Sequence, residues 1–418
     1  MDNHKYKFAA FALAAGCFAG AVTIIYRLLL SRAEKIMFAV TEFVRGNIFY
    51  TAAWFAVLIL LALITAFLLK CEPYIGGSGI PQVEAETRGY INQCWYKVLL
   101  CKLAGGVLCV LGGLSLGREG PSIQLGAMAG KGLCRRTGCK SEREKNILLS
   151  CGASAGLAAA FNAPLAGIMF SIEEVHKSLS PALLTALMLS SFISDFLSKL
   201  VFGQQPVFTF ELKQFVPLKL FPVLIIMSII LGIAGTIYNI IIPYAQRIFK
   251  KIKKPFNIVI PFILAGILGK LIPDVLGSGH SMISILEYGG VTLRFLLTLL
   301  AVKFIFSAIS FGSGVPGGIF FPLLVLGAYI GGCFGMLNIC GEYIYNIIII
   351  AMAGLFSSIV RAPVTGIILI CEMSGSSDIL PLVTVSAISY ITAGFFKSKP
   401  IYDILLANLI NKPTEEIS

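Results

Sequence analysis

The chain has 418 residues, of which 57% are hydrophobic and only 13% are charged, and its mean hydropathy is +0.88. Soluble domains carry charge on about a quarter of their residues, so this composition excludes a soluble globular protein and predicts a polytopic membrane protein. The net charge of +12 does not indicate nucleic-acid binding, because the basic residues cluster in short loops between apolar runs.

The first apolar run, residues 8–30, follows a lightly basic N-terminus. It is long enough to cross the hydrocarbon, for which about 20 residues suffice, so we expect a retained helix rather than a cleaved signal peptide. Further apolar segments are expected at residues 51–69, 96–114, 147–161, 164–172, 181–202, 220–243, 256–272, 293–311, 319–337, 345–359, 363–371 and 379–396. Several are too short to span alone, which predicts re-entrant or broken helices.

Two clusters of basic residues, at 131–145 and 247–254, indicate the orientation in the membrane. The positive-inside rule places both in the cytoplasm. Between the two clusters, a re-entrant pair at 147–172 enters and leaves on the same side, and two full spans at 181–202 and 220–243 cross the membrane. Segment 203–217 joins these two spans, so it is expected outside. We expect a multi-pass protein of the cell membrane with both termini in the cytoplasm.

Two halves of the chain share motifs in the same order. Leu125-Gly126-Ala127 follows Pro121, and Leu326-Gly327-Ala328 follows Pro322; from 121 to 322 the offset is 201. Such repeats are typical of transporters built from inverted halves, whose site lies between discontinuous helices. We therefore predict an all-α transport domain with repeats at 1–202 and 219–396 and a C-terminal cytoplasmic segment at 397–418. The alternative is that small-residue packing patterns coincide by chance.

Four glycine-rich or polar breaks interrupt the apolar runs, at residues 76–81, 117–121, 312–322 and 399–402. In the first three, glycines precede a proline that fits the first turn of a helix. Each would place a helix N-terminus inside the membrane, where free N–H groups and a partial positive charge favour an anion. Any one break alone is equally compatible with a kink or a tight turn.

The second break, Gly117-Arg118-Glu119-Gly120-Pro121, contains an ionisable side chain within the membrane. A charge there costs about 2.5–3.5 kcal/mol on insertion scales, so Glu119 is a functional candidate by default. A membrane-embedded enzyme with Glu119 and Glu174 as acid and base is a weaker alternative, because no nucleophile–base pair accompanies them. The eleven cysteines and three histidines have no metal-ligand spacing, so no metal and no cofactor are expected.

The segments 77–81, 117–121 and 318–322, together with 158–174 and 359–373, resemble the signatures of the CLC family of chloride channels and chloride/proton antiporters. The resemblance runs almost from end to end. It implies transport of small anions through a homodimer with one pathway per subunit. Because the chain ends sixteen residues after Tyr402, the regulatory CBS domains of some family members are not expected.

The resemblance also implies an anion site. Ser78 resembles the serine whose hydroxyl contacts the central anion, and Tyr402 resembles the tyrosine that does so from the cytoplasmic side. Backbone N–H groups near five residues would line the central and external sites: Arg118, Gly120, Ile319, Phe320 and Phe321. Gln82 departs from the family pattern, in which a glutamate commonly follows the first break.

Two glutamates carry the implied proton coupling. Glu119 resembles the gating glutamate, and Glu174 resembles the internal proton-transfer glutamate of the antiporters, where channels commonly carry an apolar residue. The alternative for Glu174 is a solvated helix end beside His176 and Lys177. We expect chloride/proton exchange; a passive chloride channel of the same fold, or selectivity for fluoride or nitrate, remains an alternative.

Overall fold

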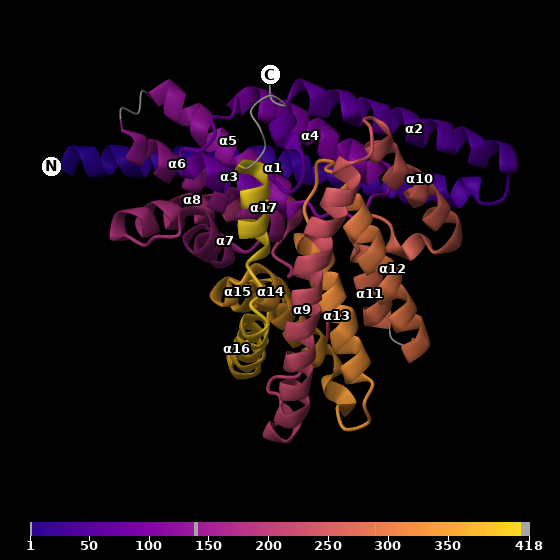
Figure 1. The fold of residues 1–418 in the computed structure, drawn as a ribbon. Helices are drawn as coiled ribbons and strands as arrows, with labels where there is room; N and C mark the ends of the chain where they lie inside the picture. The colour runs from indigo at the N-terminus through magenta and orange to yellow at the C-terminus, as the bar shows by residue number, and fades with distance from the viewer. Residues whose placement is uncertain (1, 138–140, 289, 411–418) are drawn as a thin grey trace.

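The computed structural model describes residues 2–137, 141–288 and 290–410. Within these ranges the chain forms seventeen α-helices and no strand, which confirms the predicted all-α class (Figure 1). Helices of the first half lie across the top of the view, from the N-terminal end of α1 on the left to α2 on the right. Most of those of the second half lie below them, and α17 returns to pack against α3 of the first half. Six helices are long and apolar enough to cross a membrane.

The first half contains α1 (Asp2–Val44), α2 (Ile48–Cys71), α3 (Ile80–Thr87), α4 (Trp95–Leu111), α5 (Glu119–Thr137), α6 (Glu142–Phe161), α7 (Pro164–Phe170) and α8 (Pro181–Phe202). The second half contains α9 (Phe221–Lys250), α10 (Phe256–Leu271), α11 (His280–Tyr288), α12 (Leu293–Gly312), α13 (Phe320–Gly335), α14 (Ile344–Val360), α15 (Pro363–Ser374) and α16 (Ile379–Phe395). Helix α17 (Ile401–Ile410) follows, and a π-helical turn, η2 (Ser171–His176), extends α7.

Helices α3, α7 and α11 have between seven and nine residues, which confirms the prediction of broken helices. The first three predicted breaks do precede helix starts, with Pro81, Pro121 and Pro322 in the first turns of α3, α5 and α13. The predicted end of one span was wrong, because Pro243 lies inside α9, which continues to Lys250. A proline is tolerated there since neighbouring helices compensate for its missing hydrogen bond.

Two buried lysines show how closely the halves repeat one another. The Lys102 ammonium donates to the carbonyl oxygens of Ile75 and Gly77 at 2.8 and 2.7 Å. The Lys303 ammonium donates to those of Val275 and Gly277, both at 2.9 Å. The carbonyl groups at a helix break cannot all accept regular helical hydrogen bonds. Each lysine donates to two of them instead.

The repeat extends to a break that our sequence analysis did not include. Gly277-Ser278-Gly279 precedes α11 as Gly77-Ser78-Gly79 precedes α3, and Gly277 and Gly279 have the same positive φ as their counterparts. The identical tripeptide at an offset of 200, from 77 to 277, is the signal that would have revealed it.

Helices α7 and α15 cap each other across the repeat boundary. Glu173, in the turn after α7, accepts hydrogen bonds from the backbone N and the hydroxyl of Thr365 at 2.8 and 2.5 Å. Glu372, in α15, accepts from Leu165 N and Ala166 N at 3.1 and 2.8 Å. Each carboxylate satisfies free N–H groups at the start of the other helix and complements its dipole.

We predict that Glu372→Ala lowers the free energy of unfolding by about 1–3 kcal/mol, because two N–H groups of α7 lose their acceptor. The matched control is Glu342→Ala, which removes a 62% exposed carboxylate paired with Lys213 and should cost less than about 1 kcal/mol. Thermal and denaturant unfolding of the purified protein in detergent measure both variants. Equal losses would show that the capping contact does not stabilise the fold.

Candidate functional site

Three helix breaks that are distant in the sequence meet in one place. Gly117 N donates to Gly318 O at 2.7 Å, and Gly318 N donates to Gly117 O at 2.8 Å. Gly77 is joined in the same way to the third break, since its carbonyl oxygen accepts from Gly317 N at 3.1 Å. These backbone bridges hold the N-terminal ends of α3, α5 and α13 close together.

The Glu119 carboxylate lies at the start of α13. The side chain is 1% exposed, and its Oε2 accepts a hydrogen bond from Phe321 N at 3.3 Å. The same oxygen lies against Gly117, where a Cβ atom would collide with it. The carboxylate therefore occupies the position where the dipole and a free N–H group of α13 favour a negative charge.

Several buried hydroxyl groups near these helix ends, Ser122 Oγ among them, have no hydrogen-bond partner in the part of the chain that the structure describes, and they include the two that the resemblance implies as anion ligands, Ser78 Oγ and the Tyr402 hydroxyl. Tyr402 lies in the first turn of α17, and α17 packs against α3. Ser78 lies just before α3, and its Oγ is directly against Gly120. A buried hydroxyl without a partner costs about 1–3 kcal/mol. A small anion between the Ser78 and Tyr402 hydroxyls would accept both hydrogen bonds.

Aromatic side chains close this region off from water. Phe320 is fully buried and packs against Phe161, Phe170 and Phe356 with ring centroids 4.8 to 6.0 Å apart. Phe170 in turn meets the Tyr402 ring edge-on at 6.2 Å. Ile319, the residue before α13, is fully buried as well. Electrostatic interactions are stronger in such a low-dielectric setting than in water.

Glu174 is buried, with 4% of its surface exposed. Its Oε2 has no hydrogen-bond partner among the described residues. The alternative of a solvated helix end is therefore wrong for this residue. The Tyr402 hydroxyl is within electrostatic range of both Glu174 and Glu119.

A charged cluster beside Glu174 was not predicted. Lys177 Nζ lies 2.8 Å from Glu84 Oε1 and 2.6 Å from Asp403 Oδ1, and the charges of all three residues act on Glu174. The cluster joins α3, η2 and the start of α17. Its members are separated by 93 or more positions, and only the charge of Glu84 within a short membrane helix gave a signal in the sequence.

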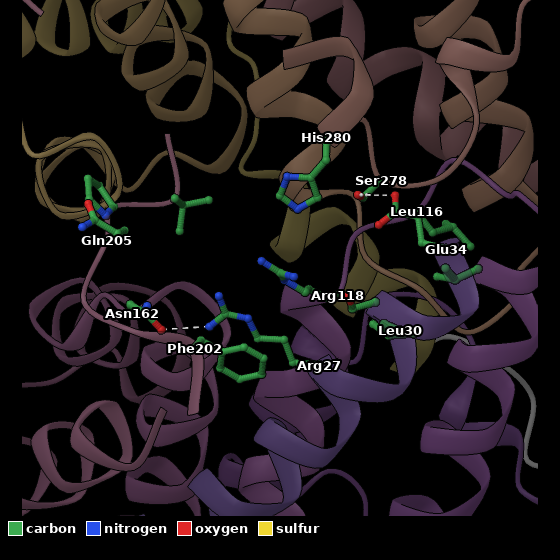
Figure 2. Close-up of a pocket in the computed structure, with 14 residues that line it drawn as sticks. Arg27, Leu30, Glu34, Leu116, Arg118, Asn162, Phe202, Gln205, Ser278 and His280 are labelled. Atoms are coloured by element: carbon green, nitrogen blue, oxygen red, sulfur yellow. Dashed lines mark hydrogen bonds between the residues drawn. The ribbon is translucent and has the colours of Figure 1, made fainter. Parts of the chain in front are cut away.

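A cavity of about 370 Å³ is lined by Arg118, the residue before Glu119 (Figure 2). The Arg118 side chain points into this cavity, toward Arg27 and His280, so only the backbone of Arg118 is available to the region around Ser78. Gln205, Pro206 and Val207 of the segment after α8 complete part of the wall. In the described residues no group of three His, Cys, Asp or Glu side chains has the arrangement of a metal site.

The model of the voltage gated chloride channel family matches residues 60–394. The chain belongs to this family, the CLC family. The chain is similar to the H⁺/Cl⁻ exchange transporter ClcA of Vibrio cholerae, with 32% identity over 97% of this chain and 90% of that protein. ClcA of Salmonella paratyphi B is 31% identical over 100% of this chain and 92% of its own length.

Solved CLC structures share the fold. A slow cyanobacterial Cl⁻/H⁺ antiporter superposes with a TM-score of 0.90 at 26% identity, covering 97% of this chain and 98% of its own. A CLC-type fluoride/proton antiporter superposes with a TM-score of 0.73 at 23% identity, covering 93% and 96% of the two chains. This second likeness concerns the fold alone.

The unpartnered hydroxyls lead to a prediction about Ser78→Ala and Tyr402→Phe. Without chloride, both variants should be at least as stable as the wild type, because no hydrogen bond is lost. Chloride at 100 times its dissociation constant should stabilise the wild type by about 2.7 kcal/mol and the variants by less. Thermal unfolding with and without chloride measures this difference.

The control for this prediction is Ser194→Ala, which removes a buried hydroxyl that donates to Ala155 O at 2.7 Å. This variant should lose stability equally with and without chloride. If Ser78→Ala behaved like Ser194→Ala, the Ser78 hydroxyl would not be a chloride ligand.

Proposed function

We propose that this protein exchanges chloride for protons across the cell membrane as a secondary active transporter. The observation that carries the proposal is the Glu119 carboxylate at the N-terminus of α13, beside two buried hydroxyls that lack a partner. The similar proteins named H⁺/Cl⁻ exchange transporters support it. Transport of this kind requires no cofactor, and chloride and protons are its substrates.

The anion site is built without a fully charged ligand. Ser78 and Tyr402 donate their hydroxyl protons, and backbone N–H groups come from the starts of α5 and α13, near Arg118, Gly120, Ile319, Phe320 and Phe321. Dipoles and neutral donors hold an anion weakly enough for release, which conduction requires. The lysines nearest to the breaks, Lys102 and Lys303, are occupied by carbonyl groups and do not bind the anion.

Coupling arises because chloride and the Glu119 carboxylate compete for one electropositive position. When chloride arrives, the carboxylate leaves the end of α13 for surroundings with fewer N–H donors and less positive potential. The neutral acid is the more stable form there, so displacement goes together with proton uptake. When the anion departs, Glu119 loses the proton and returns to Phe321 N.

Glu174 supplies the proton from the cytoplasmic side. Both Glu174 and Glu119 act electrostatically on the Tyr402 hydroxyl, so in this mechanism proton transfer and anion movement share the region around this tyrosine but use different groups. Lys177 stabilises the negative charge of Glu174, whereas its partners Glu84 and Asp403 oppose that charge, and the pair between Lys177 and Asp403 ties α17 to this region. Protons and chloride then move in opposite directions.

The placement in the membrane follows from charge. The basic residues at the end of α9, with Arg135 at the end of α5 and Arg143 and Lys145 at the start of α6, face the cytoplasm, together with both termini. The cavity lined by Arg118 then belongs to the outer side, because segment 203–217 contributes to its wall. Two subunits associate through apolar side chains of α7 and α8, such as Leu165, Phe192 and Phe196, which are 44 to 57% exposed.

We predict that Glu174→Gln lowers proton flux at least about tenfold while chloride flux persists, because a proton carrier is lost and the anion site is retained. In proteoliposomes, an imposed chloride gradient drives uphill proton movement in the wild type. The control is Glu173→Gln, since the neighbouring Glu173 caps α15 and should leave proton transport in place. Chloride flux without coupled protons in the wild type would instead indicate a passive channel.

Glu119→Gln tests the gate. Glutamine has the shape of the protonated acid and cannot titrate, so chloride flux should become uncoupled from protons and independent of pH. The wild type should transport chloride faster as the pH falls, because protonation removes the competing carboxylate. Chloride flux measured across the pH range decides the matter, and a pH dependence that survives the substitution would place the gate elsewhere.

A further inference from the structure

The outer cavity contains two guanidinium groups without an anionic partner (Figure 2). In the residues that the structure describes, neither Arg27 nor Arg118 forms an ion pair, and Arg118 Nε has no hydrogen-bond partner at all. Their positive charges are close enough to act on each other and on the His280 ring. Two like charges at a partly buried site are unfavourable unless an anion joins them.

Arg27 is held rigidly at this position. Its Nη1 donates to Asn162 Oδ1 at 2.8 Å and to Ala159 O at 3.1 Å, and the guanidinium lies 3.9 Å from the centre of the Phe202 ring. The remaining N–H groups face the cavity, on the side of Arg118 (Figure 2). A donor that is already oriented loses little entropy when it binds a ligand.

Glu34, the acidic residue of the cavity wall, forms no ion pair with either arginine among the described residues, although the Arg118 charge acts on it. Its carboxylate accepts a hydrogen bond from Ser278 Oγ at 3.4 Å and lies against Gly277, with the Lys303 charge also nearby. Figure 2 shows Glu34 on the other side of Arg118 from Arg27. The break before α11 thus already holds a carboxylate, whereas the Arg27 end of the cavity stays positive.

We propose that the Arg27 end of the cavity is a binding site for a small oxyanion of the sulfate or phosphate type, bridged between Arg27 and Arg118. Guanidinium groups match the oxygens of such anions in pairs, which a monatomic halide cannot exploit. The cavity, at about 370 Å³, is larger than one halide requires. Gln205 and His280 line the same space and add neutral hydrogen-bonding groups.

An oxyanion at this site inhibits exchange from the outer side. The oxyanion binds to Arg118, the residue next to Glu119, and so blocks the access of chloride to the anion site. It is too large to pass inward along the path that chloride takes. This inhibitory effect rests on the proposed exchange function. Binding itself does not, and Glu119→Gln should bind the oxyanion at least as tightly as the wild type, because a negative charge that acts on Arg118 is removed.

Calorimetric titration of the purified full chain with sodium sulfate, in buffer without chloride, tests the binding. We expect one sulfate per chain, and we expect Arg27→Gln to weaken it at least about tenfold, because a charge-assisted hydrogen bond is lost. The matched control is Lys219→Gln, which removes an exposed positive charge from the same side of the molecule but outside the cavity. It should leave sulfate affinity unchanged.

A second pair of variants keeps the structural contacts of Arg27 intact. Ser31 is exposed at the cavity wall one helical turn after Arg27, so Ser31→Glu places a carboxylate within reach of the guanidinium. We expect Ser31→Glu to abolish sulfate binding and Ser31→Gln to preserve it. Such a difference between the two Ser31 variants could not come from a loss of the Arg27 contacts with Ala159 and Asn162.

Short-chain phosphatidylglycerol, titrated below its micellar concentration, distinguishes a lipid headgroup from a free ion as the source of the oxyanion. Binding of either probe that depends on Arg27 supports the site. Absence of binding by both, or equal affinity of the wild type, Arg27→Gln and Ser31→Glu, overturns it. External sulfate should slow chloride flux in the wild type but not in Ser31→Glu. If sulfate binds to the wild type and its chloride flux stays unchanged, the inhibitory role is contradicted.

Discussion

Helix ends inside a membrane leave backbone groups that water cannot reach, and much of this structure depends on how they are satisfied. The starts of α7, α13 and α15 each meet a carboxylate from a distant part of the chain, namely Glu372, Glu119 and Glu173. At the same breaks, the ammonium groups of Lys102 and Lys303 donate hydrogen bonds to backbone carbonyl oxygens. At these positions the charged partners offset part of the cost of breaking the helices.

The start of α3 differs from this pattern, and the proposed function rests on the difference. There the neighbouring groups are the hydroxyls of Ser78 and Tyr402, which have no partner among the described residues. A carboxylate at this position would hold the site permanently, whereas two neutral donors would leave it to a mobile anion. In the proposed mechanism Glu119, on α5, takes the anion's place and gives it up again. Competition between a tethered carboxylate and a free anion would then connect proton movement to chloride movement.

The sequence predicts the breaks because glycine and proline have local conformational requirements that no distant residue alters. It also marks Glu119 as a candidate functional residue, since a charge within a membrane segment is costly. It does not reveal which helix end each carboxylate meets. Glu119 and Phe321 are 202 positions apart, and nothing local to either residue indicates the other. The Lys177 cluster and the opposed arginines of the outer cavity escaped prediction for the same reason, since a solvated surface charge and a buried one look alike in sequence.

The central claim is that chloride and the Glu119 carboxylate exclude one another from the end of α13. The most direct measurement is the number of protons taken up when chloride binds to the purified protein in weakly buffered solution near neutral pH. The account predicts proton uptake that approaches one per subunit and disappears in Glu119→Gln, although this variant still binds chloride. Chloride binding without proton uptake in the wild type at any pH would contradict it.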